Sequence, residues 1–236
     1  MAVNAPEDLA IYLAGDDLIQ ADHPLIREKA ALITAGIEDQ RTKAIRVFYW
    51  VRDQIAYCIE AERPALEVLT EGRGVCVTKA ILHVAILRAA GVPARLGHCD
   101  YKSFVLRKMF PATYMDRQPE TYPLHTFAEV YLDGAWITCD ATVDRGFAQD
   151  LGFALNEFDG IHATDTMVGA ANEVLRYASA SGEELMRRYA VALGDIGVSH
   201  DELRRQFQLL DVYVELLRVR RRVESLERMV GEKLLS

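Results

Sequence analysis

The chain has 236 residues, half of them apolar, so it can bury a sizeable core in one large domain or in one domain with an appendage. Its formal charge of −8 disfavours a nucleic-acid-binding protein, because such proteins usually present a basic surface. The first residues lack the features of a secretory signal, and no apolar run is long enough to cross a membrane. We therefore expect a cytoplasmic protein without a membrane partner.

Helical patterns fill the first part of the chain. Residues 24–57 read as two helices broken around "TAGIEDQ". A further helix is predicted to begin near Cys76, directly after a Gly-Arg-Gly step, and to stop at Gly91 and Pro93. This helix is apolar nearly all round, so it should lie at the centre of the core. The second of the earlier helices has one broad apolar face, formed by Ala44, Val47, Phe48, Val51 and Ile55.

Strand patterns follow at 94–101, 124–132 and 135–143. Asp133-Gly134, between the last two, is a strong signal for a two-residue hairpin turn. The stretch 102–123 contains three prolines and no clear period, which predicts a long loop of the kind that often covers active sites. Helices followed by strands predict an α+β fold with an antiparallel sheet.

The last part of the chain, after about residue 160, is predicted to be helical. Ser199 and Glu202 have the spacing of a capping box at a helix start. The stripe that follows is narrow enough to suit a partner helix, which predicts a homo-oligomer, or equally a helix that folds back on its own domain. Its apolar residues repeat at intervals of four and three: Leu203, Phe207, Leu210, Val214 and Leu217. Four arginines interrupt this spacing: Arg218, Arg220, Arg221 and Arg222. They are interpreted as a solvated face of the helix and not as a site for an acidic partner.

Cysteine usage raises the first chemical question. Cys58, Cys76, Cys99 and Cys139 occur singly, without paired spacing, and this favours free thiols over disulfides. Cys76 stands at a helix N-terminus, where unpaired backbone N–H groups and the helix dipole favour a thiolate. The same N–H groups can stabilise an oxyanion. Taken alone, however, a cysteine is more often a buried packing residue.

The hairpin supplies possible partners for Cys76. A two-residue turn at 133–134 places His125 opposite Thr142 and diagonal to Asp140, on one face of the sheet. A carboxylate at that position can orient an imidazole. Cysteine, histidine and aspartate in this order are the parts of an acyl-transfer triad, in which the thiolate attacks and the imidazole moves protons.

Three stretches carry a family resemblance: "AIRVFYWVRDQIAY", "GRGVCVTKAILHVAILRAAGVPARL" and "HTFAEVYLDGAWITCDAT". Their motifs are Gly-x-Cys heading a helix, Gly-x-Pro-Ala-Arg leading into a strand, a histidine opening a strand, and tryptophan followed four residues later by aspartate. Over roughly residues 40–145 the chain resembles the transglutaminase-like superfamily of papain-related cysteine enzymes. The resemblance implies Cys76 as nucleophile, His125 as base and Asp140 as orienter. Ala141 departs from the proline that many members carry after the aspartate.

Other residues are weaker candidates for a catalytic or metal-binding role. His83 is about 10 Å along the helix from Cys76 and is interpreted as a core histidine. Cys139 points to the sheet face opposite Asp140 and is assigned to packing. His98 and the adjacent Cys99 point to opposite faces and lack metal-ligand spacing, so no metal site is predicted. Asp144 is the alternative carboxylate that could orient His125 in place of Asp140. Tyr57 and Trp136 could line the cleft, although such aromatic residues are more often core.

The resemblance predicts a catalytic domain at 1–160, with its papain-like core at about 40–145, and a helical C-terminal extension at 161–236. The expected reaction is cysteine-dependent acyl transfer or hydrolysis at an amide of a peptide or protein, through a thioester and with no cofactor or metal. Whether water or an amine accepts the acyl group stays open, as does the second oxyanion donor. The alternative is a non-catalytic binding or assembly module that uses the helix from Ser199 as its interface.

Overall fold

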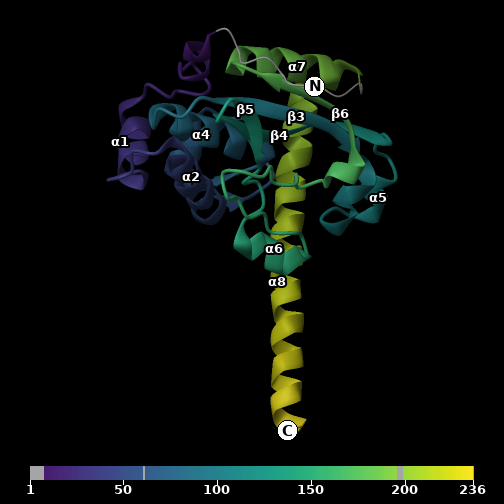
Figure 1. Ribbon diagram of the computed structural model, residues 1–236. Helices are drawn as coiled ribbons and strands as arrows, with labels where there is room; N and C mark the ends of the chain where they lie inside the picture. Colours follow the sequence, from purple (N-terminus) through teal and green to yellow (C-terminus); the bar gives the residue numbers. More distant parts are fainter. Residues whose placement is uncertain (1–7, 61, 196–198, 236) are drawn as a thin grey trace.

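A four-stranded antiparallel sheet packed on a buried helix forms the centre of the molecule (Figure 1). The computed structural model describes residues 8–60, 62–195 and 199–235. The sheet order is β5-β4-β3-β6. This is the α+β architecture that the order of helices and strands predicted. The strands are β3 (Ala94–Lys102), β4 (Thr121–Leu132), β5 (Ala135–Cys139) and β6 (Glu173–Ser179).

The buried helix is α4 (Cys76–Ala89), and every residue from Val77 to Arg88 in it is buried. Its continuous apolar character is explained by contacts on all sides, since it packs on β3 and β4 and on three other helices. The helix ends where the sequence predicted, with Gly91 in the left-handed region at φ 79°. The three helices around it are α1 (Pro24–Ile33), α2 (Gln40–Gln54) and α3 (Ala65–Glu71).

The β4–β5 hairpin has the predicted register. Leu132 pairs with Ala135 across Asp133-Gly134, whose φ angles of 49° and 84° fit a turn with two left-handed residues. The ladder ends at the pair Ala128–Cys139, so β5 is four residues shorter than the pattern 135–143 suggested. The predicted His125–Thr142 pair is therefore not a ladder pair. The chain turns away at Asp140, because its carboxylate accepts the Thr142 N–H at 2.8 Å instead.

The segment expected to be one long loop contains short elements, η2 (Ser103–Lys108) and α5 (Ala112–Met115), before β4 begins at Thr121. β6 was not anticipated, because the sequence after residue 160 was interpreted as helical. It forms the edge of the sheet beside β3. The remaining short elements are η1 (Leu9–Tyr12), β1 (Ala56–Tyr57), β2 (Arg73–Gly74), α6 (Arg145–Leu151) and η3 (Ala170–Asn172).

Two helices, α7 (Gly182–Asp195) and α8 (His200–Leu235), close the chain, and α8 is a single helix of 36 residues. Ser199 accepts a hydrogen bond from the Glu202 N–H at 3.2 Å, as a capping residue should. In the part of the chain that the structure describes, no helix is long and apolar enough to cross a membrane.

The narrow stripe on α8 packs on the protein's own domain. Leu210 and Val214 are buried in the core, and Phe207 and Leu217 are partly buried against it, whereas the side chain of Leu203 lies outside the described structure. The arginine cluster is not a purely solvated face. Arg218 is only 8% exposed and binds Asp150 of α6 at 2.8 Å.

The Arg218–Asp150 pair predicts a strong stability effect. Asp150→Ala would leave the buried Arg218 without its main partner and release Arg222, which also binds Asp150 at 2.6 Å. We expect a loss of about 3 kcal/mol in the free energy of unfolding, measured by urea denaturation at pH 7. The control is Asp116→Ala, which removes an exposed ion pair with Arg107 and should cost under about 1 kcal/mol. Equal losses in the two variants would contradict this role of Asp150.

Candidate active site

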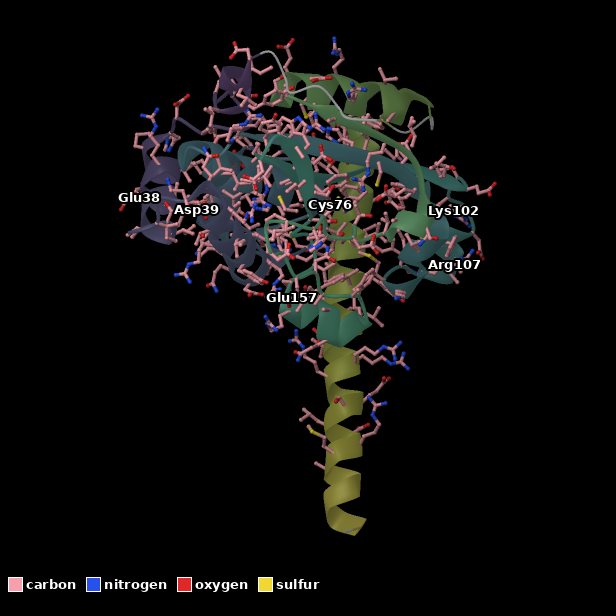
Figure 2. The ribbon with its side chains drawn as sticks, in the orientation of Figure 1. Glu38, Asp39, Cys76, Lys102, Arg107 and Glu157 are labelled. Carbon is pink, nitrogen blue, oxygen red and sulfur yellow. The ribbon has the colours of Figure 1, made fainter. Side chains whose placement is uncertain are left out.

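Cys76 is the first residue of α4 and lies near the middle of the domain (Figure 2). It is the one half-buried thiol among four free cysteines. Among the described residues, no side chain caps the helix start at Val75, which leaves first-turn N–H groups for a negatively charged sulfur or oxygen. Glycine is favoured at position 74, two residues before Cys76, because a Cβ atom there would lie 2.6 Å from the Thr78 hydroxyl oxygen.

His125, the fifth residue of β4, meets Asp140, which directly follows the last residue of β5. The His125 Nε2 atom lies 2.8 Å from the Asp140 Oδ2 atom, and both side chains are almost completely buried. A carboxylate only accepts hydrogen bonds, so the Nε2 atom of His125 carries a proton. The Nδ1 atom is then available to exchange a proton with a thiol. Cys76 is near enough to be among the groups that raise the pKa of His125. The structure thus brings together the three residues that the hairpin register and the resemblance selected.

The electrostatics of the pair favour a charged imidazole. Burial by itself lowers the pKa of His125, but the hydrogen-bonded Asp140 carboxylate and the nearby Cys76 outweigh burial and raise this pKa to about 10. Burial likewise raises the pKa of Asp140, and the neighbouring His125 overcomes this and holds the pKa below its usual range. At neutral pH the arrangement therefore holds an imidazolium between a carboxylate and the Cys76 sulfur.

Asp140 is fixed by a segment that sequence reasoning did not connect with the site. Its Oδ2 atom also accepts the Met167 N–H at 2.8 Å, and its own N–H donates to the Thr164 hydroxyl at 2.8 Å. The Asn156 side chain donates to the Asp140 carbonyl at 3.0 Å. The Met167 bond helps to satisfy the buried carboxylate, and the other two bonds fix the backbone of Asp140, so the side chain stays directed toward His125. No pattern in the sequence marks these residues, because the loop meets Asp140 only in the folded chain.

Three tyrosines lie near enough to Cys76 for its charge to affect their pKa. Burial, and then the nearby Cys76, raise the pKa of Tyr57, Tyr101 and Tyr189 well above the usual value. The Tyr101 ring meets the His125 ring edge-on, with centroids 6.3 Å apart. Tyr57 was a candidate from the sequence, whereas Tyr101 and Tyr189 were missed. Trp136, the other candidate, lies elsewhere and contacts Tyr12, Tyr131 and Arg95.

Helix α8 reaches the segment that precedes the nucleophile. The Asp211 carboxylate accepts hydrogen bonds from Arg73 Nη2 at 2.5 Å and from the Ile59 N–H at 2.8 Å. Arg73 is three residues before Cys76, so these bonds brace the turn that leads into α4. This contact joins residues 138 positions apart in the sequence, and no sequence pattern indicated it.

The remaining candidates are structural. His83 is 1% exposed and contacts the Phe48 ring, and burial lowers its pKa to about 3, which confirms a core histidine. Cys139 is fully buried and its thiol donates to the Ala128 carbonyl at 3.4 Å. Asp144 caps α6 by accepting the Phe147 N–H at 2.8 Å, so it does not act on the histidine.

His98, the histidine next to Cys99 on β3, is buried between two hydroxyl groups. Both of its ring nitrogens are engaged, Nδ1 with the Thr126 hydroxyl at 3.1 Å and Nε2 with the Ser179 hydroxyl at 3.0 Å. Within the described ranges, no three His, Cys, Asp or Glu side chains gather in a way that could hold a metal ion.

Residues 27–141 match the family model of the transglutaminase-like superfamily. A candidate cysteine protease from Cytophaga hutchinsonii is similar in structure, with 22% identity, a TM-score of 0.46 and coverage of 74% of this chain and 54% of that chain. A candidate protease from Parabacteroides distasonis has 13% identity and a TM-score of 0.40, over 70% of this chain and 30% of that chain. The chain thus spans about half or less of these proteins. No curated protein matches it.

Proposed function

We propose that this protein is a cysteine enzyme that transfers the acyl group of an amide, because residues 27–141 match the model of the transglutaminase-like superfamily. Cys76 attacks the carbonyl carbon, the carbon–sulfur bond forms, and the oxygen takes the negative charge. First-turn N–H groups of α4 stabilise that oxyanion. The carbon–nitrogen bond then breaks as His125 gives its proton to the leaving nitrogen, which yields a thioester on Cys76 and a free amine.

The second half returns the enzyme to its starting state. His125 takes a proton from water or from an acceptor amine, which attacks the thioester carbon, and the Cys76 thiolate leaves. Water makes the enzyme a peptidase or amidase, and an amine makes it a transglutaminase. The observation that carries the proposal is the buried His125–Asp140 bond of 2.8 Å beside the half-buried Cys76, because it supplies nucleophile, proton carrier and orienter in one place.

The proposed substrate is an amide in a peptide or protein, and the four free thiols support a cytoplasmic location. Residues 1–160 form the proposed catalytic domain, and residues 161–236 are a C-terminal extension that adds β6 to the edge of its sheet. The extension would support the site directly, since Met167 binds Asp140 and Asp211 binds Arg73.

Selective alkylation of Cys76 tests the chemistry without a known substrate. We expect iodoacetamide to label Cys76 at pH 6 and at nearly the same rate at pH 8, because His125 stays protonated over this range and pairs with the sulfur. Mass spectrometry of the labelled protein gives the rate at each cysteine. His125→Ala should make the rate at Cys76 rise steeply with pH.

The other cysteines serve as internal controls. Burial raises the pKa of Cys58 to about 12 and also raises the pKa of Cys99 and Cys139, so all three should label slowly at every pH tested. A Cys76 that reacts no faster than these, and only above pH 8, would show that the site is inert. The chain would then be the binding or assembly module.

A further inference from the structure

The second face of α8 carries an apolar stripe that the domain does not cover. Its residues are 48% to 74% exposed, Val223 being the least and Leu209 the most exposed. This stripe lies opposite the face that holds Leu210 and Val214 in the core. We call it the seam. It consists of Leu209, Val212, Leu216, Val219, Val223, Leu226 and Val230.

The spacing of the seam is 3-4-3-4-3-4 without interruption, just over three heptads. An exact alternation of three and four averages 3.5 residues per turn, which keeps one stripe facing a partner helix in a left-handed coiled coil. Packing on a domain surface needs a wider stripe and a period nearer 3.6. The seam extends roughly 30 Å at 1.5 Å per residue, a length typical of stable two-stranded coils.

The distal part of α8 leaves the domain altogether. Beyond α6 the helix continues alone, and its side chains point into open space (Figures 1 and 2). An isolated helix gains little from its own hydrogen bonds and needs packing to be stable. In this distal part the seam has Val223 and Val230 at the first core position of the heptad and Leu226 at the second, the pattern that favours two parallel strands.

We propose that the seam pairs in parallel and in register with the seam of a second copy of this chain, which makes the protein a coiled-coil dimer. The flanking charges fit this arrangement. In a parallel pair, Glu215 faces Arg220 of the second copy, and Arg222 faces Glu227. Both contacts are attractive, and the symmetry of a homodimer makes each of them twice.

The same charges disfavour other registers. A slip of one heptad would place Glu215 against Glu227 and Arg222 against Arg220, so both contacts would become repulsive. An antiparallel pair centred on the seam keeps a Glu215–Arg222 contact but leaves Glu227 without a cation across the interface. Arg222 uses Nε and Nη2 to hold Asp150 of its own domain, which leaves Nη1 for the second copy.

The seam does not include the residue of α8 that supports the active site. Asp211, which braces the Cys76 segment through Arg73, belongs to the domain-facing side of α8 and not to the seam. Changes in the seam should therefore separate the subunits without altering the site. This separation gives the proposal a readout that is independent of catalysis.

Light scattering of the full-length protein tests the proposal. We expect a mass of about twice the 26.5 kDa of one chain. Leu226→Glu, and more strongly Val219→Glu with Leu226→Glu, should raise the dissociation constant at least about tenfold, because a charge enters the seam. Ser225→Glu adds the same charge one residue away, outside the seam, and should keep the dimer. All variants should keep the wild-type rate of Cys76 alkylation, which shows that the domain is folded.

Charge reversal tests the direction and register. Glu215→Arg alone and Arg220→Glu alone should each weaken the dimer, and the double variant should restore it, because the two residues face each other only in the parallel, in-register pair. A monomeric wild-type protein at every concentration would overturn the second copy as the partner. A trimeric or tetrameric mass would overturn the two-stranded coil. Failure of the double variant to recover would overturn the parallel register.

Discussion

Cys76→Ala is expected to abolish turnover of any amide substrate, with kcat falling by roughly 10⁶-fold to the background rate. The loss is this large because alanine has no atom that can form the thioester, so the remaining groups have no covalent intermediate to act on. The measurement is turnover of whichever member of a panel of fluorogenic peptide amides the wild-type protein cleaves. Unchanged far-UV circular dichroism would show that the variant folds.

Cys139→Ala is the matched control. It removes the same atom from a buried position whose thiol donates to the Ala128 carbonyl and points away from the reacting groups. We expect a small loss of stability, on the order of 1 kcal/mol, and nearly unchanged kcat. Equal losses of turnover in the two variants would mean that global destabilisation, and not removal of a nucleophile, explains the effect of Cys76→Ala.

Local patterns were sufficient to predict that His125 and Asp140 meet. A two-residue turn at Asp133-Gly134 fixes the register of the hairpin, and strand alternation then puts His125 and Asp140 on one face. The uniformly apolar sequence after Cys76 likewise identified α4 as the buried helix. These features depend on residues close together in the chain, so one sequence contains the information.

Features that depend on distant parts of the chain could not be predicted. β6 was missed because only pairing with β3 makes "EVLRYAS" a strand. Met167 and Asp211 meet the site across long stretches of chain, and neither belongs to a motif. The sequence showed one apolar stripe on α8 and could not show which face the domain covers. Since the domain buries Leu210 and Val214, the face left for a partner is the opposite one.

The remaining prediction concerns the orienter. Asp140→Asn should lower kcat by about 10² to 10⁴-fold, because the amide removes the charge that holds the His125 imidazolium and its tautomer. The stability profile should change as well. The folded pKa of His125, about 10, is above its unfolded value of about 6.5. The pair therefore contributes stability that is complete below pH 6.5 and is lost as pH rises toward 10.

Urea unfolding of wild type and Asp140→Asn at pH 6 and pH 10 measures this second effect. The wild-type protein should lose more stability over that interval than the variant, because the variant lacks the carboxylate that raises the His125 pKa. Asp144→Asn is the control, since Asp144 accepts backbone N–H bonds from Tyr57 at 2.6 Å and Phe147 at 2.8 Å and does not touch the histidine. It should cost about 1–3 kcal/mol of stability and leave kcat nearly intact. If Asp144→Asn reduced kcat as strongly as Asp140→Asn, the orienting carboxylate would be wrongly assigned.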